Sequence, residues 1–172
     1  MNKFILLCCT LMYLSCAQDN TIVPDHVLTA DQKHNKFSKL IPPVLRAKSG
    51  DIIKADAYEA SDNQLHRNAT LDDLINIDFG PIPAMTGPVY IKGAKRGDAL
   101  EVELLDIVPD EYGYTVIVPG FGFLRDIFTE PFIVNWKLTR TGAVSDDMPG
   151  VTIPYEAFPG SIGVLPGNKE IS

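Results

Sequence analysis

Short apolar stretches, several of them alternating with polar residues, recur along the chain after residue 50 and predict β-strands. The clearest is Ala99–Ile107, where apolar side chains alternate with two glutamates, as in a strand with one face in water. Clusters of Gly, Pro and Asp separate the other candidate strands, which are Asp51–Tyr58, Pro88–Lys92, Tyr112–Val118 and Pro131–Leu138. We therefore expect a mainly β fold, with antiparallel strands in a sandwich- or barrel-like arrangement and one or two short helices.

A short helix is predicted to begin near residue 70. Thr70 and Asp73 have the spacing of a capping box, in which each side chain satisfies a backbone N–H group of the other residue. Leu71, Leu74 and Ile75 supply the apolar positions that such a helix would turn towards a core.

One five-residue pattern occurs twice. Ala47–Asp51 reads AKSGD and Ala94–Asp98 reads AKRGD, and a candidate strand follows each copy. Glycine tolerates the positive φ of a tight turn, and aspartate can bond to its own backbone there. The pattern predicts a similar turn in front of a strand at both places, and it carries no chemistry by itself.

The first sixteen residues have the pattern of an export signal. Lys3 precedes an almost unbroken apolar run from Phe4 to Leu14, which is too short to span a bilayer as a permanent helix. Residues 1–16 are therefore expected to be a signal peptide, and the polar, aperiodic residues 17–33 a tether or arm in front of the domain.

Leu14-Ser15-Cys16 resembles a bacterial lipobox, in which the cysteine becomes the lipidated N-terminus. Tyr13 departs from that motif, which usually has leucine there, and ordinary cleavage without lipidation is the alternative. We expect an exported bacterial protein that is either periplasmic or anchored to a membrane as a lipoprotein through Cys16.

Composition narrows the function classes. The chain has 172 residues, and 15 Lys and Arg against 22 Asp and Glu give a net charge of −7. This acidic balance argues against a nucleic-acid partner, which needs clustered Lys and Arg. All cysteines lie in or at the edge of the leader, at Cys8, Cys9 and Cys16. The mature chain therefore offers no thiol catalyst and no blue-copper site, and it has no Gly-x-Ser-x-Gly elbow either.

A collinear series of short strings across residues 34–166 resembles the N-terminal half of the acetamidase/formamidase family. It consists of His34-Asn35-Lys36-Phe37, Ile41-Pro42-Pro43-Val44, Ser49-Gly50-Asp51, Thr86-Gly87-Pro88-Val89-Tyr90, Gly93-Ala94, Gly97-Asp98-Ala99-Leu100, Pro119-Gly120-Phe121-Gly122-Phe123-Leu124, Trp136, Gly150-Val151-Thr152-Ile153-Pro154, Phe158-Pro159-Gly160 and Gly163-Val164. The later Gly-Gly-Asn-x-Asp and Gly-Asp-Gly-Glu motifs of the family are absent. Residues 34–172 are thus expected to be the N-terminal part of such a domain, without its C-terminal half.

The resemblance implies a hydrolase that splits small linear amides, such as formamide or acetamide, into a carboxylate and ammonia. It also implies a homo-oligomer and, for some members of the family, a metal-dependent site. Because the sequence has neither a thiol nor a serine elbow, water activated by a divalent metal such as zinc is the economical nucleophile. The alternative is a truncated, non-catalytic exported β module with a binding or scaffold role.

Three places in the sequence carry the candidate site. His34 stands at the family's His-Asn position and is a candidate metal ligand, unless it only fixes the N-terminal arm by hydrogen bonding. Asp56, at the end of a predicted strand, is a candidate catalytic carboxylate and metal ligand, unless it is simply solvated. The Gly120-Phe121-Gly122 loop is a candidate substrate contact, unless its ring belongs to the core. Pro83 stands where many relatives carry a histidine.

Overall fold

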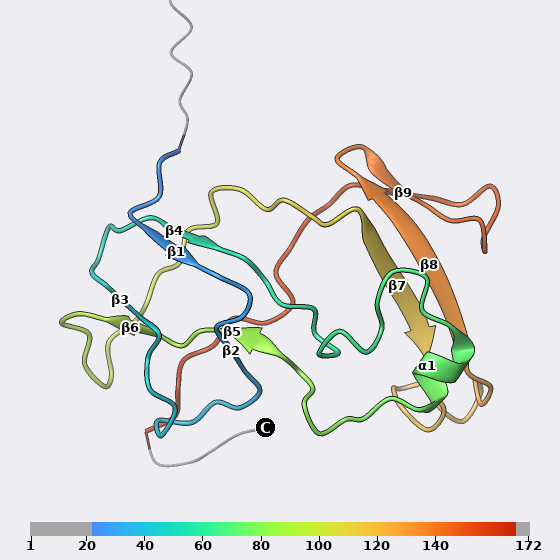
Figure 1. Cartoon of the computed structure of the whole chain (residues 1–172), viewed down its shortest axis with the longest axis horizontal. Coiled ribbons are helices and arrows are strands. Elements are labelled where there is room, and N and C mark those ends of the chain that lie inside the picture. Colours follow the sequence, from blue (N-terminus) through green and yellow to red (C-terminus); the bar gives the residue numbers. More distant parts are fainter. Residues whose placement is uncertain (1–21, 168–172) are drawn as a thin grey trace, which may run out of the picture.

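The computed structural model describes residues 22–167, so the predicted signal peptide and Cys16 lie outside the described residues. The elements in chain order are β1 (His26–Leu28), β2 (Lys33–His34), β3 (Leu45–Ala47), β4 (Ile53–Ala55), α1 (Leu71–Ile75), β5 (Met85–Thr86), β6 (Val89–Ile91), β7 (Tyr112–Ile117), β8 (Phe132–Thr139), β9 (Gly142–Val144) and β10 (Thr152–Pro154). The fold is mainly β with one short helix, as predicted (Figure 1).

The strands form four small sheets. The largest is antiparallel, in the order β10-β9-β8-β7. The other three are two-stranded: β2 pairs antiparallel with β5, whereas β1 pairs with β4 and β3 with β6 in parallel. The described strands therefore form no closed barrel, and two of the pairs are parallel where antiparallel pairs were expected. Figure 1 shows the two-stranded sheets gathered on one side of the molecule and β7–β9 with α1 on the other.

Helix α1 begins where the capping box predicted it. The Thr70 hydroxyl accepts the Asp73 N–H at 3.3 Å, and the Asp73 carboxylate accepts the Thr70 N–H at 2.7 Å. Leu74 is only 1% exposed and packs with Leu65 and Ala69. Side chains from β7 and β8, among them Ile133, cover this cluster, so the helix is docked against the large sheet.

A second core cluster lies on the opposite face of β8. Val134 and Trp136 are 2% and 7% exposed and pack with Ala143 of β9. The indole Nε1–H of Trp136 donates to the Thr115 hydroxyl of β7 at 3.0 Å. Successive residues of a strand point to opposite faces, so β8 supplies both clusters, and the β7–β8 hairpin is the rigid centre of this side of the molecule.

The two copies of the repeated pattern form the same turn. In each, the lysine N–H donates to the aspartate carboxylate, at 3.0 Å between Lys48 and Asp51 and at 2.8 Å between Lys95 and Asp98. The aspartate N–H returns a bond to the lysine carbonyl, at 3.2 and 3.1 Å. The glycines have φ values of 87° and 98°, as the sequence predicted.

Three details differ from the sequence predictions. Residues 26–28, within the predicted arm, form β1 and pair with β4, so this part of the arm belongs to the fold. Asp51–Tyr58 is a strand only over Ile53–Ala55, because β1 is just three residues long. Ala99–Ile107 is not a strand, since a strand needs a hydrogen-bonded neighbour and no described segment pairs with it.

Across residues 22–167, no helix has the length and apolar character needed to cross a membrane.

Candidate functional site

His34 lies at the point where two distant strings of the sequence meet. It belongs to β2, whose antiparallel register with β5 places His34 opposite Met85 and Lys33 opposite Thr86. Gly87 follows β5 with φ 134°, and a Cβ there would lie 3.6 Å from Nε2 of His34. The Thr86-Gly87 turn therefore packs directly against the imidazole, and glycine leaves the space beside Nε2.

The hydrogen bond of the His34 ring fixes its tautomer. Nδ1 lies 2.8 Å from the carbonyl oxygen of Lys36. A carbonyl can only accept, so Nδ1 carries the proton and, in the neutral ring, Nε2 holds a lone pair. This is the arrangement of a histidine that is ready to bind a cation or to accept a proton.

A third string reaches His34 through Phe37. The two rings meet edge to face, with centroids 6.4 Å apart and planes at 81°. On the far side of Phe37 the chain passes so close that a Cβ on Gly163 would lie 2.7 Å from a ring carbon. Glycine at 163 therefore permits this close approach to Phe37. The 86–88 string contacts His34 directly, and the 163–164 string contacts Phe37, which in turn packs against His34.

Asp56 lies next to this place but points its carboxylate into water. Its backbone N–H donates to Leu28 at 2.9 Å, and its carbonyl accepts the hydroxyl of Thr86 at 2.9 Å. The carboxylate is 3.8 Å from Lys54 Nζ, and the side chain is 47% exposed. Thr86 thus ties the end of β4 to β5, which brings Asp56 to the element beside His34.

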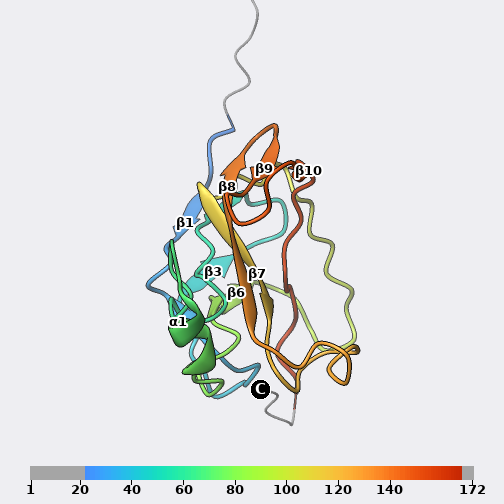
Figure 2. The ribbon, with the colours of Figure 1, turned by 90° about the vertical axis from the view of Figure 1, so that its right-hand side faces the viewer.

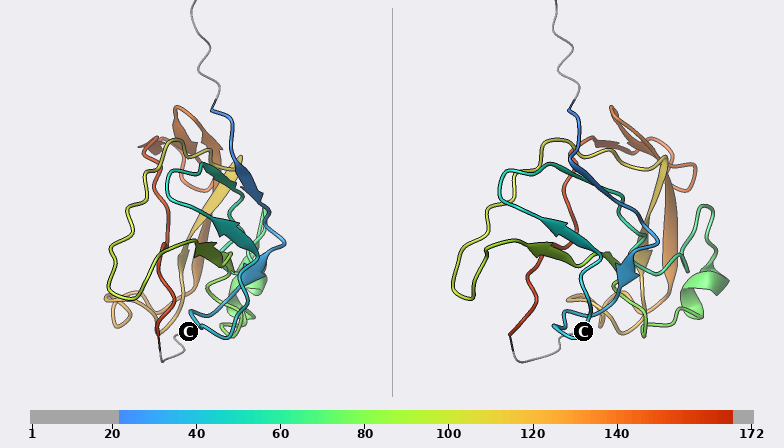
Figure 3. Two further views of the ribbon diagram at one scale, coloured as in Figure 1. Left: turned by 90° about the vertical axis from the view of Figure 1, so that its left-hand side faces the viewer. Right: turned by 60° about the vertical axis from the view of Figure 1, so that its left-hand side comes forward.

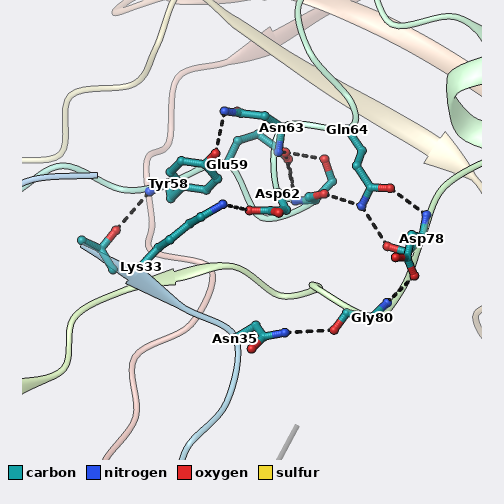
Figure 4. A network of polar contacts seen from close by, with 11 residues as sticks. Lys33, Asn35, Tyr58, Glu59, Asp62, Asn63, Gln64, Asp78 and Gly80 are labelled. Atoms are coloured by element: carbon teal, nitrogen blue, oxygen red, sulfur yellow. Dashed lines mark hydrogen bonds and ion pairs between the residues drawn. The ribbon is translucent and has the colours of Figure 1, made fainter. Parts of the chain in front are cut away.

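A polar network that the sequence did not reveal surrounds Lys33, the neighbour of His34 (Figure 4). The Lys33 ammonium pairs with Asp62 and lies 4.2 Å from the centroid of the Tyr58 ring. Its hydrogen bonds with Asp62 and then Tyr58 raise the pKa of Lys33 above its ordinary value. Lys33 is therefore held as a cation on the face of β2 opposite to His34.

Glu59 organises the loop that carries these partners. Its carboxylate accepts the backbone N–H groups of Ser61 and Asn63, both at 2.9 Å, and the hydroxyls of Ser61 and Tyr114. Burial, followed by the bond to Glu59, raises the pKa of Tyr114 well above its ordinary value, so this phenol stays a donor. The sequence offered no signal for this link, because Glu59 and Tyr114 lie on elements that are far apart in the chain.

Two side-chain amides fix the segment before β5. Gln64 donates to the Asp78 carbonyl at 2.8 Å and accepts the Asp78 N–H at 2.7 Å, and Asn35 donates to the Gly80 carbonyl at 2.9 Å (Figure 4). Asn35, which belongs to the His34–Phe37 string, and Gln64 therefore have structural roles here.

The Gly120-Phe121-Gly122 loop reaches the same segment from β7. Both glycines have positive φ, 79° and 86°. The Phe121 ring stacks on Phe79 with centroids 6.4 Å apart and is 71% exposed. Phe121 thus lies outside the core and stacks on Phe79, the residue before Gly80, whose carbonyl accepts the Asn35 amide.

The two candidate metal ligands predicted from the sequence lie in this region. Within residues 22–167 no group of three or more His, Cys, Asp or Glu side chains could hold a metal ion. His34 lies on β2, and Asp56 follows β4 and is linked to β5 through Thr86. A catalytic metal usually takes three protein ligands, so this part of the chain does not provide a complete set.

Comparison with known proteins identifies one family. The model of the acetamidase/formamidase family matches residues 23–171. The acetamidase of Mycolicibacterium smegmatis is 30% identical over 146 residues, which is 77% of this chain and 36% of that protein. The formamidase of Methylophilus methylotrophus is 26% identical over 144 residues, 80% of this chain and 35% of that protein.

Solved structures give the same result for the fold. The crystal structure of an acetamidase from Bacillus halodurans superposes with a TM-score of 0.75 at 27% identity, covering 84% of this chain and 48% of that one. The chain thus spans about a third of the length of the curated relatives and about half of this solved one. Since the family model covers nearly all the described residues, the chain belongs to the acetamidase/formamidase family.

Proposed function

We propose that this chain is part of an amidohydrolase that cleaves the C–N bond of small linear amides, such as formamide or acetamide, and releases ammonia and a carboxylate. Family membership supports the reaction class. The observation that supports the site is the packing of two family strings at His34, with Gly87 beside Nε2 and Phe37 against the ring, and of a third string, at Gly163, against Phe37.

Hydrolysis of an amide requires an activated water, a group that stabilises the developing oxyanion and an acid that protonates the leaving amine. The Nδ1–H group of His34 donates to the carbonyl oxygen of Lys36, which leaves Nε2 to accept a proton or bind a cation. Asp56 supplies a carboxylate from the adjacent strand end. Phe121, held open by two glycines, forms an apolar wall for the substrate.

The proposal includes a divalent metal such as zinc. His34 through Nε2 and Asp56 through its carboxylate are the ligands that this chain would contribute, and the rest of the set would come from outside the described residues. A bound cation of this kind lowers the pKa of its water and so supplies the nucleophile.

The second candidate is a non-catalytic exported module with a binding or scaffold role. Two observations favour it: the incomplete donor set within residues 22–167, and Pro83 at the position where the family resemblance implies a histidine.

Ammonia release from formamide and acetamide separates the two. The 172-residue chain alone should give no measurable turnover, while its fusion to the unmatched part of the Bacillus halodurans acetamidase should be active and sensitive to chelators. In the fusion, His34→Gln should abolish turnover. The matched control is His66→Gln, because His66 makes the same Nδ1 bond to a carbonyl, also 2.8 Å, at an exposed loop. Turnover by the chain alone would refute a divided site.

Asp56 has a separate test in the same fusion. Asp56→Asn should reduce turnover strongly, and Asp126→Asn, a similar change at an exposed position, should not. Full activity of the Asp56→Asn enzyme would remove Asp56 from the site and leave the rest of the proposal standing.

We also propose export, with a lipid on Cys16, and assembly as a homo-oligomer. Mass spectrometry of the native N-terminus would give a diacylated Cys16 if the lipobox is used. An intact Met1 on a cytoplasmic protein would refute export, and a monomeric mass in light scattering would refute the oligomer.

A further inference from the structure

Residues 99–107 are extended but have no strand partner. Within the described chain, no backbone hydrogen bond joins any of these nine residues to another. Leu100, Val102 and Leu104 are 51%, 52% and 50% exposed, so the apolar side chains of the predicted alternation are uncovered. Extended backbone with unpaired N–H and C=O groups is a template for another strand.

Both ends of this segment are nevertheless fixed. The repeated turn at Lys95–Asp98 holds its start. At its end, Asp106 pairs with Arg140 at 3.3 Å, and the Ile107 carbonyl accepts the Tyr155 hydroxyl at 2.6 Å. The segment is therefore held in an extended shape by its ends while its middle stays open.

The two copies of the repeated turn differ in whether the segment that follows them is paired. The turn at Lys48–Asp51 leads into β4, which pairs with β1. The same turn at Lys95–Asp98 leads into 99–107, for which the described chain offers no such neighbour. Because the same turn precedes a paired strand in one place and an unpaired segment in the other, we infer that the partner of residues 99–107 lies outside the described chain.

The uncovered residues share one side of the molecule. Figures 2 and 3 show the 99–107 segment, the loop after β7 and the chain after β10 all on the side away from α1 and β1. We call this side the open face and define it by residues 99–107, 122–131 and 155–165. Its exposed large apolar side chains are Leu100, Val102, Leu104, Leu105, Phe123, Leu124, Ile127, Phe128, Phe158, Ile162 and Val164.

Clustered apolar exposure marks an interface. The eleven side chains of the open face are among 28 large hydrophobic side chains that are exposed in the described residues. The relatives indicate the occupant, because the matching fold makes up only 48% of the Bacillus halodurans acetamidase and 36% of the Mycolicibacterium smegmatis one. About half or more of a family-length chain therefore lies outside the matched fold.

We propose that the open face is covered by the remaining part of a family-length chain, which adds a β-strand to residues 99–107. The pairing uses the free backbone groups of the segment and buries Leu100, Val102 and Leu104. Glu101 and Glu103 remain on the water side. The proposal rests on family membership and on this face, and it does not depend on the catalytic activity.

The test uses the 172-residue chain and, as probe, the unmatched part of the Bacillus halodurans acetamidase produced as a separate polypeptide. Amide hydrogen exchange should be fast over 99–107 in the chain alone and at least tenfold slower with the probe, in a 1:1 complex. Val102→Lys should weaken the complex at least tenfold. The matched control is Val27→Lys, because Val27 is 53% exposed on β1, away from the open face, and should change the affinity less than twofold.

Each other outcome overturns the proposal. It fails if the two polypeptides do not associate, or if they associate while 99–107 still exchanges freely. Protection that appears without the probe as the chain concentration rises, together with a dimeric mass, would assign the face to a second copy. Both valines are exposed, so unchanged melting of the two lysine variants checks that each still folds.

Discussion

A methyl group added at Gly163 tests the packing that holds His34. The new Cβ would lie 2.7 and 3.0 Å from two carbons of the Phe37 ring, whereas carbon atoms normally approach to about 3.5–4.0 Å. Gly160, in the same segment, has no atom within 4 Å of its Cβ position, and neither glycine has a left-handed φ. Gly163→Ala and Gly160→Ala are therefore a matched pair that differs only in this contact.

The two substitutions should have opposite effects on stability. Where alanine fits, Gly→Ala stabilises by about 0.4–1 kcal/mol because it restricts the unfolded chain. Overpacking costs about 1–3 kcal/mol. We expect Gly160→Ala to be neutral or slightly stabilising and Gly163→Ala to lower the free energy of unfolding. At about 2–4 °C per kcal/mol for a chain of this size, the midpoints should differ by several degrees.

Thermal unfolding followed by Trp136 fluorescence measures the difference, since this is the only tryptophan of the chain and it is 7% exposed. The NMR signal of the His34 ring gives a second measurement, because losing its edge-to-face contact with Phe37 changes the ring-current shift. Equal midpoints for both variants together with an unchanged His34 signal would refute the packing argument.

Three further predictions concern local stability. Thr70→Ala should lower the free energy of unfolding by about 1 kcal/mol, because it removes the N-terminal cap of α1. Thr70→Ser should retain most of that stability in urea unfolding, and equal losses in the two variants would contradict the role of the cap. Leu74→Ala should cost about 2–5 kcal/mol, against a negligible effect of Ile75→Ala at a 60% exposed position. The Lys48 N–H and then His26 lower the pKa of Asp51 below its ordinary 3.8, so its contribution is present above that value and is lost as the pH falls through the lowered pKa. The free energy of unfolding should therefore fall less steeply with decreasing pH for Asp51→Asn than for the unchanged chain. An unchanged pH profile would refute this role of Asp51.

Local signals in the sequence predicted local structure well. The capping box of Thr70 and Asp73 and the two Ala-Lys-x-Gly-Asp turns depend on contacts within five residues, and each forms as predicted. The strands β7 and β8 also agree with their predicted ranges within one or two residues, because their partners are adjacent in the chain.

Features that depend on distant partners could not be predicted. The pairing of His34 with Met85, and the bond between Glu59 and Tyr114, leave no trace in local patterns. In residues 99–107 the alternation of apolar and polar residues predicted an extended segment, but it could not predict the pairing, which depends on a neighbouring strand. The roles of His34, Asp56 and Phe121 in a site remain predictions, although the packing of Gly87 and Phe37 against His34, and of Gly163 against Phe37, was visible only in three dimensions.

The order of the two-stranded sheets has a consequence for folding during synthesis. β1 pairs with β4, β2 with β5 and β3 with β6. Each of the first three strands can therefore pair only after a strand three positions further along the chain has been synthesised. No hairpin can nucleate this region, and pairings of such sequence separation form slowly. The region cannot close until Ile91 has emerged, whereas β7, β8 and β9 can pair as soon as they are made. The late pairing over residues 26–91 is compatible with the export proposed above, because a translocation channel accepts unfolded chains.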